Sequence, residues 1–125
     1  FPFAAYEDTE LGYRLCGRGM RLGFMATAVV FHDHPTSIAR FARRQWRCGF
    51  SAVRFRHLHP ELHWFVRLPV EGPPQPASST AVAVSTVIGR VLEPLPVSLP
   101  KLWTRILDGH FARGAVAAHR SFDTH

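Results

Sequence analysis

Cysteine and lysine are scarce in this chain. Its 125 residues include two cysteines, Cys16 and Cys48, which are too few for a framework of disulfide bonds. They fit a reducing compartment, and the sequence leaves a single bridge between them open. Lys101 is the one lysine, so fourteen of the fifteen basic side chains are arginines. Such a bias is typical of a GC-rich genome, so part of the arginine content reflects codon usage rather than chemistry.

A long hydrophobic run and a targeting segment are also missing. The longest uncharged, fairly apolar run, 77–89, falls short of the roughly 18 residues that a membrane-spanning helix needs. The start, Phe1-Pro2-Phe3, has no Met and none of the basic and apolar regions of a signal peptide. We therefore expect a cytoplasmic protein. Because an acidic motif follows within ten residues of the start, we also expect a fragment of a larger domain.

The composition is that of a folded domain. Hydrophobic residues make up 46% of the chain and charged residues 19%, which excludes a disordered chain and a collagen. The length fits about one domain. The 15 basic residues outnumber the 9 acidic ones and give a formal net charge of +6, so anionic partners are favoured.

A helix is predicted over residues 6–18. Leu11 and Leu15 stand four positions apart, and acidic residues occupy the first turn, where they favour the positive end of the helix dipole. Asp8 or Thr9 could cap this helix through its side chain.

A strand and a second helix are predicted to follow. Residues 21–31 end in a continuous apolar run, which is typical of a strand buried on both faces. Residues 36–56 form the helix, with Thr36 or Ser37 as its cap and Gly49 as a candidate break. Its apolar face carries Ile38, Phe41, Gln45, Cys48, Ala52 and Phe55. The opposite face carries Arg40, Arg44, Arg47 and Arg54.

The C-terminal part has a different composition. Residues 68–76 are a proline-rich linker between an N-terminal unit (1–67) and a helical tail (77–125). In the tail we expect a small-residue helix over 77–92 and a short amphipathic stretch from Leu102, with the last ten residues frayed.

Three short motifs could carry chemistry. Glu7-Asp8-Thr9-Glu10-Leu11 places carboxylates at a helix start, where one can take a proton from a hydroxyl, although helix-end electrostatics is the simpler explanation. His32-Asp33-His34 has the ligand types for a divalent metal, but such pairs are common. Arg43-Arg44-Gln45-Trp46-Arg47 can bind phosphate through planar guanidinium forks, or can simply be the solvated face of a helix.

Taken together and in this order, the motifs resemble the C-terminal half of a family 2 glycosyltransferase. The resemblance covers about residues 1–65 and consists of E-D-x-E-L-x-x-R-L, a glycine, a short strand, a histidine and an arginine-rich helix that ends near Gly49. It implies an α/β fold, namely the C-terminal part of the Rossmann-like GT-A fold, and sugar transfer with inversion. Gly49-Phe50-Ser51-Ala52 followed by His59-Pro60 is further similar to mycofactocin-type glycosyltransferases of actinobacteria.

The resemblance implies a role for each motif. Asp8, with Glu7 as its neighbour, would be the base that deprotonates the acceptor hydroxyl. That hydroxyl then attacks the anomeric carbon from the face opposite the leaving nucleoside diphosphate. His32, or else His34, would bind the Mg²⁺ or Mn²⁺ on the diphosphate in the complete enzyme, in a Lewis-acid role. The donor diphosphate or the acceptor would contact Arg43, Arg44, Gln45, Trp46 and Arg47.

Some motifs of the family are missing from this sequence, and their absence limits the function that the resemblance predicts. The sequence has no D-x-D and no glycine-rich phosphate loop, so no metal is assured in this fragment, and we expect the fragment alone to be inactive. Gln45-Trp46-Arg47 departs from the Q-x-x-R-W of processive members, which argues against a cellulose- or chitin-synthase type. Glu10 and Arg14 are expected to be structural. The implied partners are a nucleotide-diphospho-sugar donor and a glycan, lipid-linked or peptide-derived hydroxyl acceptor, with no nucleic acid.

Two other functions stay open. The net positive charge and the arginine-lined helix fit a nucleic-acid-binding module, although the arginines are spread over the chain and no known nucleic-acid-binding signature appears. Arginines of the second helix, with Trp46 and Phe50 on a neighbouring flank, could instead rest on the anionic inner face of a membrane. The second alternative is compatible with sugar transfer to a lipid-linked acceptor.

Overall fold

The part of the chain that the computed structural model describes is all-helical. It comprises residues 5–33, 36–66, 68, 75, 78–95 and 99–122, of which 69% lie in helices. The elements are α1 (Glu7–Gly17), α2 (Ile38–Leu58), the short 3-10 helix η1 (Pro60–Leu62), α3 (Ser79–Leu92) and α4 (Pro100–Phe122). Across these ranges no residue lies in a strand, so the predicted α/β, GT-A-like fold is wrong.

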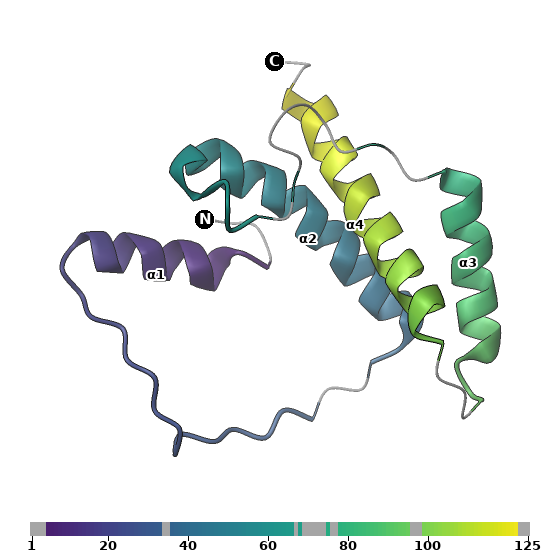
Figure 1. Cartoon of the computed structure of the whole chain (residues 1–125), viewed down its shortest axis with the longest axis horizontal. Helices are drawn as coiled ribbons and strands as arrows, with labels where there is room; N and C mark the ends of the chain where they lie inside the picture. Colours follow the sequence, from purple (N-terminus) through teal and green to yellow (C-terminus); the bar gives the residue numbers. More distant parts are fainter. Residues whose placement is uncertain are drawn as a thin grey trace.

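The expected strand over residues 21–31 is an exposed, irregular connection. Figure 1 shows it as a wide loop between α1 and α2, away from the other helices. Phe24 and Phe31 are each 95% exposed. A strand persists only when its backbone groups pair with a neighbouring strand, and the described residues supply no such neighbour. The apolar run that predicted burial is therefore solvated in this structure.

Helices α2, α3 and α4 pack side by side, with α4 between the other two (Figure 1). Helices α2 and α4 run in the same direction, and α3 runs opposite to them. Val53 of α2 is buried against Ala115 and Ala118 of α4, with Phe50 and Phe122 packed around this cluster. A second buried cluster joins Ala52, Phe55 and Val66. The core therefore sits mainly between α2 and α4.

Two glycines let α2 and α4 approach closely. A Cβ atom added at Gly49 would lie 2.7 Å from the carbonyl carbon of Phe111, and one added at Gly114 would lie 2.8 Å from the carbonyl carbon of Trp46. Each glycine thus faces the backbone of the other helix, where no side chain can move aside. The expectation that Gly49 breaks the helix is wrong, since α2 is continuous through it.

The local signals at the helix ends had mixed outcomes. Ser37 caps α2 as predicted, because its hydroxyl accepts a hydrogen bond from the Arg40 amide at 3.3 Å. At α1 neither Asp8 nor Thr9 is the cap; Tyr6 occupies that position without a side-chain hydrogen bond. The predicted helix in the tail is confirmed as α3.

Helix α4 is longer than expected. It runs unbroken from Pro100 to Phe122, so the stretch that begins at Leu102 is not short and the tail is not frayed as far as it is described. Its C-terminal half is ordered by burial of Gly114, Ala115 and Ala118 against α2. Of the proposed linker over 68–76, only residues 68 and 75 lie within the described part.

No helix within the described ranges combines the length and the apolar character required to cross a bilayer.

Gly49→Ala and Gly114→Ala are each expected to lower the free energy of unfolding by about 1–3 kcal/mol, because a Cβ there overlaps rigid backbone. The loss exceeds the roughly 1 kcal/mol that alanine gains in helix propensity. Gly12→Ala in α1 is the matched control, since its Cβ would make an ordinary 3.5 Å contact with Leu22. Urea denaturation followed by circular dichroism measures the three variants; equal stability of all three would contradict the close-packing interpretation.

Candidate functional site

A buried carboxylate holds α1 against the C-terminal end of α2. Glu10 is 6% exposed, and its Oε1 accepts a hydrogen bond from Arg14 Nε at 2.8 Å. The same oxygen lies 3.5 Å from His59 Nε2. On the other side of the ring, His59 Nδ1 lies 3.4 Å from Glu61 Oε1, which accepts a 2.7 Å hydrogen bond from the Tyr13 hydroxyl. The expectation that Glu10 and Arg14 are structural is confirmed.

Aromatic rings reinforce this docking. Tyr6 packs on Phe55 with ring centroids 5.2 Å apart, and Tyr13 meets the His59 ring edge-on at 5.0 Å. Phe55 is fully buried and also contacts His59, at 5.3 Å. These contacts fix where α1 begins relative to α2. They therefore fix the position of the acidic residues in its first turn.

The network shifts the pKa values of its members. Burial by itself raises the pKa of Glu10, but the hydrogen bond and charge of Arg14, with a smaller contribution from His59, bring that pKa below its ordinary value. The hydrogen bond from Tyr13 lowers the pKa of Glu61, and the same bond raises the pKa of Tyr13. Both carboxylates are thus held ionised by the contacts that dock α1.

An arginine-lined cavity lies where the start of α1 meets the N-terminal half of α2. It has a volume of about 260 Å³ and is lined by Ala5, Glu7, Arg40, Arg43, Arg44 and Arg47. We call it the arginine hollow. All six side chains are solvent-exposed, so water screens their charges in part. The cavity brings together one predicted catalytic carboxylate, Glu7, and all three arginines predicted to contact the donor diphosphate or the acceptor.

Ala5 enters the arginine hollow with an unusual backbone. Its φ of 87° lies in the left-handed region, which a residue with a Cβ rarely adopts. This turn directs the chain into α1 beside the arginines.

The remaining predicted residues lie elsewhere. Asp8 is exposed on α1 but does not line the arginine hollow. Gln45 is half-buried in α2, and Trp46 is 37% exposed and stacks on Phe50 with centroids 5.5 Å apart. His32 is exposed in the connection between α1 and α2.

The predicted metal ligands form no cluster in the described structure. Among the residues placed by the structure, no three His, Cys, Asp or Glu side chains gather closely enough to hold a metal ion. His34, the second choice as a ligand, lies outside the described residues. The two cysteines are free thiols: Cys16 is exposed and Cys48 half-buried, and burial raises the pKa of Cys48.

A second basic cavity adjoins the first and was not predicted. It measures about 350 Å³, and Arg43 lines both cavities. Its other basic residues are Arg90 of α3 with His110 and Arg113 of α4. Burial, and then the charge of Arg113, lower the pKa of His110. No local motif links these residues, because only the packing of three helices brings them together.

Comparisons with protein families, with curated proteins and with solved structures found no match for this chain. The function must therefore be argued from the site itself.

Acid is expected to release α1 from α2. A carboxyl group whose pKa is lower in the folded state stabilises that state fully above its unfolded value, here 4.5 for glutamate, and loses this contribution as pH falls through the folded pKa. Glu10→Gln should therefore weaken the docking at neutral pH and flatten its pH dependence below about 4.5. Hydrogen exchange of the α1 amides measures this. Asp8→Asn, an exposed neighbour, is the control, and an unchanged acid profile in Glu10→Gln would contradict the argument.

Proposed function

We propose that this chain is the acceptor-side part of an inverting family 2 glycosyltransferase, and that the arginine hollow binds the diphosphate of its nucleotide-sugar donor. The observation that carries the proposal is that Glu7 of α1 and Arg43, Arg44 and Arg47 of α2 line one cavity. The resemblance named these residues in two separate motifs. The proposal depends on this site and not on the overall fold, since a fold alone does not determine function.

The chemistry of the arginine hollow suits a diphosphate. Each guanidinium presents a planar fork of donors that matches two phosphate oxygens, and such charge-assisted bonds are stronger than neutral ones. Four arginines surround a single carboxylate, so the balance of charge favours an anion. The volume of about 260 Å³ lies just below the usual range of roughly 300–1,000 Å³ for small-molecule sites. It therefore suits the diphosphate and part of the sugar rather than a whole nucleotide-sugar.

Asp8, the residue after Glu7, is the proposed base. It is exposed in the first turn of α1, where the helix dipole favours a negative charge. In the proposed step Asp8 takes the proton of the acceptor hydroxyl, and the hydroxyl oxygen forms a bond to the anomeric carbon. The bond from that carbon to the diphosphate breaks, and the nucleoside diphosphate leaves with the electron pair. Glu7, on the wall of the hollow, would accept a hydrogen bond from a sugar hydroxyl.

The proposal assigns the nucleoside and any metal to other polypeptide. The described helices offer neither a nucleotide-binding sheet nor a cluster of metal ligands. A metal on the diphosphate would supply Lewis-acid assistance to the leaving group. His32 is the described residue that the resemblance names for it.

Removing two arginines should weaken diphosphate binding. Titration of the chain with UDP, GDP and inorganic pyrophosphate at low salt, followed by calorimetry, is expected to show binding that Arg44→Gln/Arg47→Gln weakens by about tenfold or more, since each charge-assisted hydrogen bond contributes about 1.5–3 kcal/mol. The control Arg18→Gln/Arg21→Gln removes the same charge from the exposed connection and should change affinity less than about twofold. Equal weakening by both pairs, or no binding at all, would overturn the proposal.

Binding to an anionic membrane surface is the second candidate function, because Trp46 and Phe50 stack on each other on the helix that carries these arginines, α2. The second cavity also extends the basic surface to Arg90 and Arg113. Co-sedimentation with phosphatidylserine vesicles and with Arg44→Glu/Arg47→Glu separates the two functions. Vesicle binding that the variant abolishes, without any nucleotide binding, would replace the first proposal with the second. Salt-dependent binding to random duplex DNA alone would favour a nucleic-acid module.

The chain by itself is expected to turn over no nucleotide-sugar, since it lacks a D-x-D and a phosphate loop. Release of nucleoside diphosphate from UDP- or GDP-sugars, in the presence of Mg²⁺ or Mn²⁺, measures this. Turnover above an Asp8→Asn control would show that the chain holds the donor unaided.

A further inference from the structure

The second basic cavity is built by three helices that are distant in the chain. Three arginines line it, one from each helix: Arg43 of α2, Arg90 of α3 and Arg113 of α4. Figure 1 shows these helices side by side, with α4 between the other two. We propose that this cavity is a second ligand site, separate from the arginine hollow, and that it binds a small organic phosphate monoester.

The three arginines have no acidic counterpart in the described part of the chain. No described carboxylate forms an ion pair with any of Arg43, Arg90 and Arg113, and none lines the cavity. Glu93, after α3, accepts a hydrogen bond from an amide at the start of α2. Asp108 of α4 is exposed and is not part of the lining. Three like charges at one cavity repel one another, so an anion that binds there relieves this repulsion.

The number of arginines indicates the kind of anion. A phosphate monoester has three terminal oxygens and carries a charge of about −1.5 to −2 at pH 7. Each guanidinium presents a planar fork of donors, so three of them can approach such a group from three helices. A carboxylate or a phosphate diester offers two terminal oxygens and a single charge, and would satisfy fewer donors. Codon usage explains a high arginine content, but it does not explain why three arginines meet at one cavity.

A hydrogen-bonded pair holds one wall of this cavity in place. The Thr86 hydroxyl donates to the Val82 carbonyl at 2.7 Å, so it accepts from His110 Nε2, which lies 3.1 Å away. This bond joins α3 to α4 beside the arginines. Because burial and the charge of Arg113 lower the pKa of His110, the imidazole is neutral at pH 7 and above. The positive charge of the site therefore comes from the arginines.

An apolar wall favours an ester over inorganic phosphate. Trp46 lines the cavity together with Ala39 and Ala42. The Trp46 ring stacks on Phe50 with centroids 5.5 Å apart, and 37% of the residue stays exposed. A volume of about 350 Å³ is within the usual range for small organic ligands. A ring or a short carbon body attached to the phosphate would cover this wall, which inorganic phosphate would leave in water.

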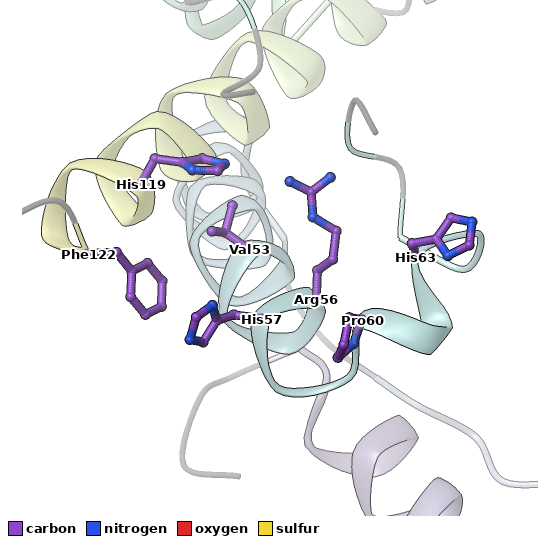
Figure 2. Close-up of a pocket in the computed structure, with 7 residues that line it drawn as sticks. All are labelled: Val53, Arg56, His57, Pro60, His63, His119 and Phe122. Atoms are coloured by element: carbon purple, nitrogen blue, oxygen red, sulfur yellow. The ribbon is translucent and has the colours of Figure 1, made fainter. Parts of the chain in front are cut away.

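A third cavity, at the C-terminal end of α2, is less suited to an anion although basic residues line it. It has a volume of about 400 Å³, and Figure 2 shows Arg56 of α2 and His119 of α4 on its walls. Both residues already take part in interactions within the protein. An anion there would have to compete with those interactions.

The test uses phenyl phosphate, with phenyl sulfate and inorganic phosphate as matched ligands. Phenyl sulfate has the same body with a single charge, and inorganic phosphate has the charge without the body. Chemical shifts of the whole chain, including the indole N–H of Trp46, are followed at about pH 8, where the monoester is doubly charged. Phenyl phosphate is expected to bind at least about fivefold more tightly than either matched ligand.

A pair of substitutions locates the ligand. Arg90→Gln/Arg113→Gln should weaken phenyl phosphate binding by about tenfold or more, as the loss of charge-assisted hydrogen bonds predicts. Both side chains are exposed, so the core is left intact. Arg18→Gln/Arg21→Gln is the charge-matched control and should change this affinity less than about twofold. Arg43 is not substituted, because it lines the arginine hollow as well.

Each part of the inference has its own contradicting outcome. Absence of phenyl phosphate binding, or equal weakening by the two arginine pairs, would overturn the site. Phenyl sulfate binding as tightly would overturn the doubly charged group, and inorganic phosphate binding as tightly would overturn the apolar body. Binding to phosphatidic acid vesicles without binding of phenyl phosphate would assign the phosphate to a lipid headgroup and refute a small-ligand site.

The inference does not require a diphosphate in the arginine hollow, so the two proposals fail separately. Arg90→Gln/Arg113→Gln should change pyrophosphate affinity less than about twofold. Phenyl phosphate binding by a chain that does not bind pyrophosphate would support this inference and contradict the proposed function.

Discussion

The close crossing of α2 and α4 is the constraint on which the other features depend. Gly49 and Gly114 carry no side chain where each helix meets the carbonyl group of the other. The two backbones can therefore approach within a distance that any Cβ would prevent. Small buried residues such as Ala115 and Ala118 continue this contact toward the helix ends. Because the helices run in the same direction, their basic last turns come together around one cavity, while arginines in the N-terminal half of α2 line the arginine hollow with Glu7 of α1.

The acidic residues in the first turn of α1 have two different roles. Successive residues of a helix are separated by about 100°, so Glu7 and Glu10 share the side that faces α2, and Asp8 lies on a neighbouring, exposed flank. Glu10 is buried in hydrogen bonds with Arg14 and near His59, whereas Glu7 lines the arginine hollow. The buried carboxylate positions the exposed ones. A site that depends on a short docked helix is consequently sensitive to anything that loosens the contact with His59.

Local sequence signals predicted the helices better than they predicted the fold. Leucine spacing, early acids and the Ser37 cap located α1 and α2, since these signals act within one turn. The strand predicted from the apolar run over residues 21–31 is wrong, because a strand needs a neighbouring strand to pair with, and the spacing of apolar residues does not show whether one is present. The short stretch and the frayed end expected in the tail were also wrong: α4 continues through Gly114, and the backbone of Trp46 opposite it explains a glycine at that place in the helix. The cavities show the same difference between local and tertiary information. Local motifs predicted Glu7 and Arg44 of the arginine hollow, but they did not predict Arg90 or Arg113 of the second basic cavity.

By itself the sequence determined an excess of arginine, the location of most helices and the two motifs that supply the arginine hollow. These are properties of composition and of contacts within a few residues. Tertiary structure alone decided that Glu10 is the buried carboxylate and that Arg56 and His119 line one cavity. It also decided that the described chain is helical without a sheet. The physical reason is that side-chain burial, and the meeting of residues from two helices at one cavity, depend on how closely the helices pack. Here that distance is set by Gly49 and Gly114, which are far apart in the chain.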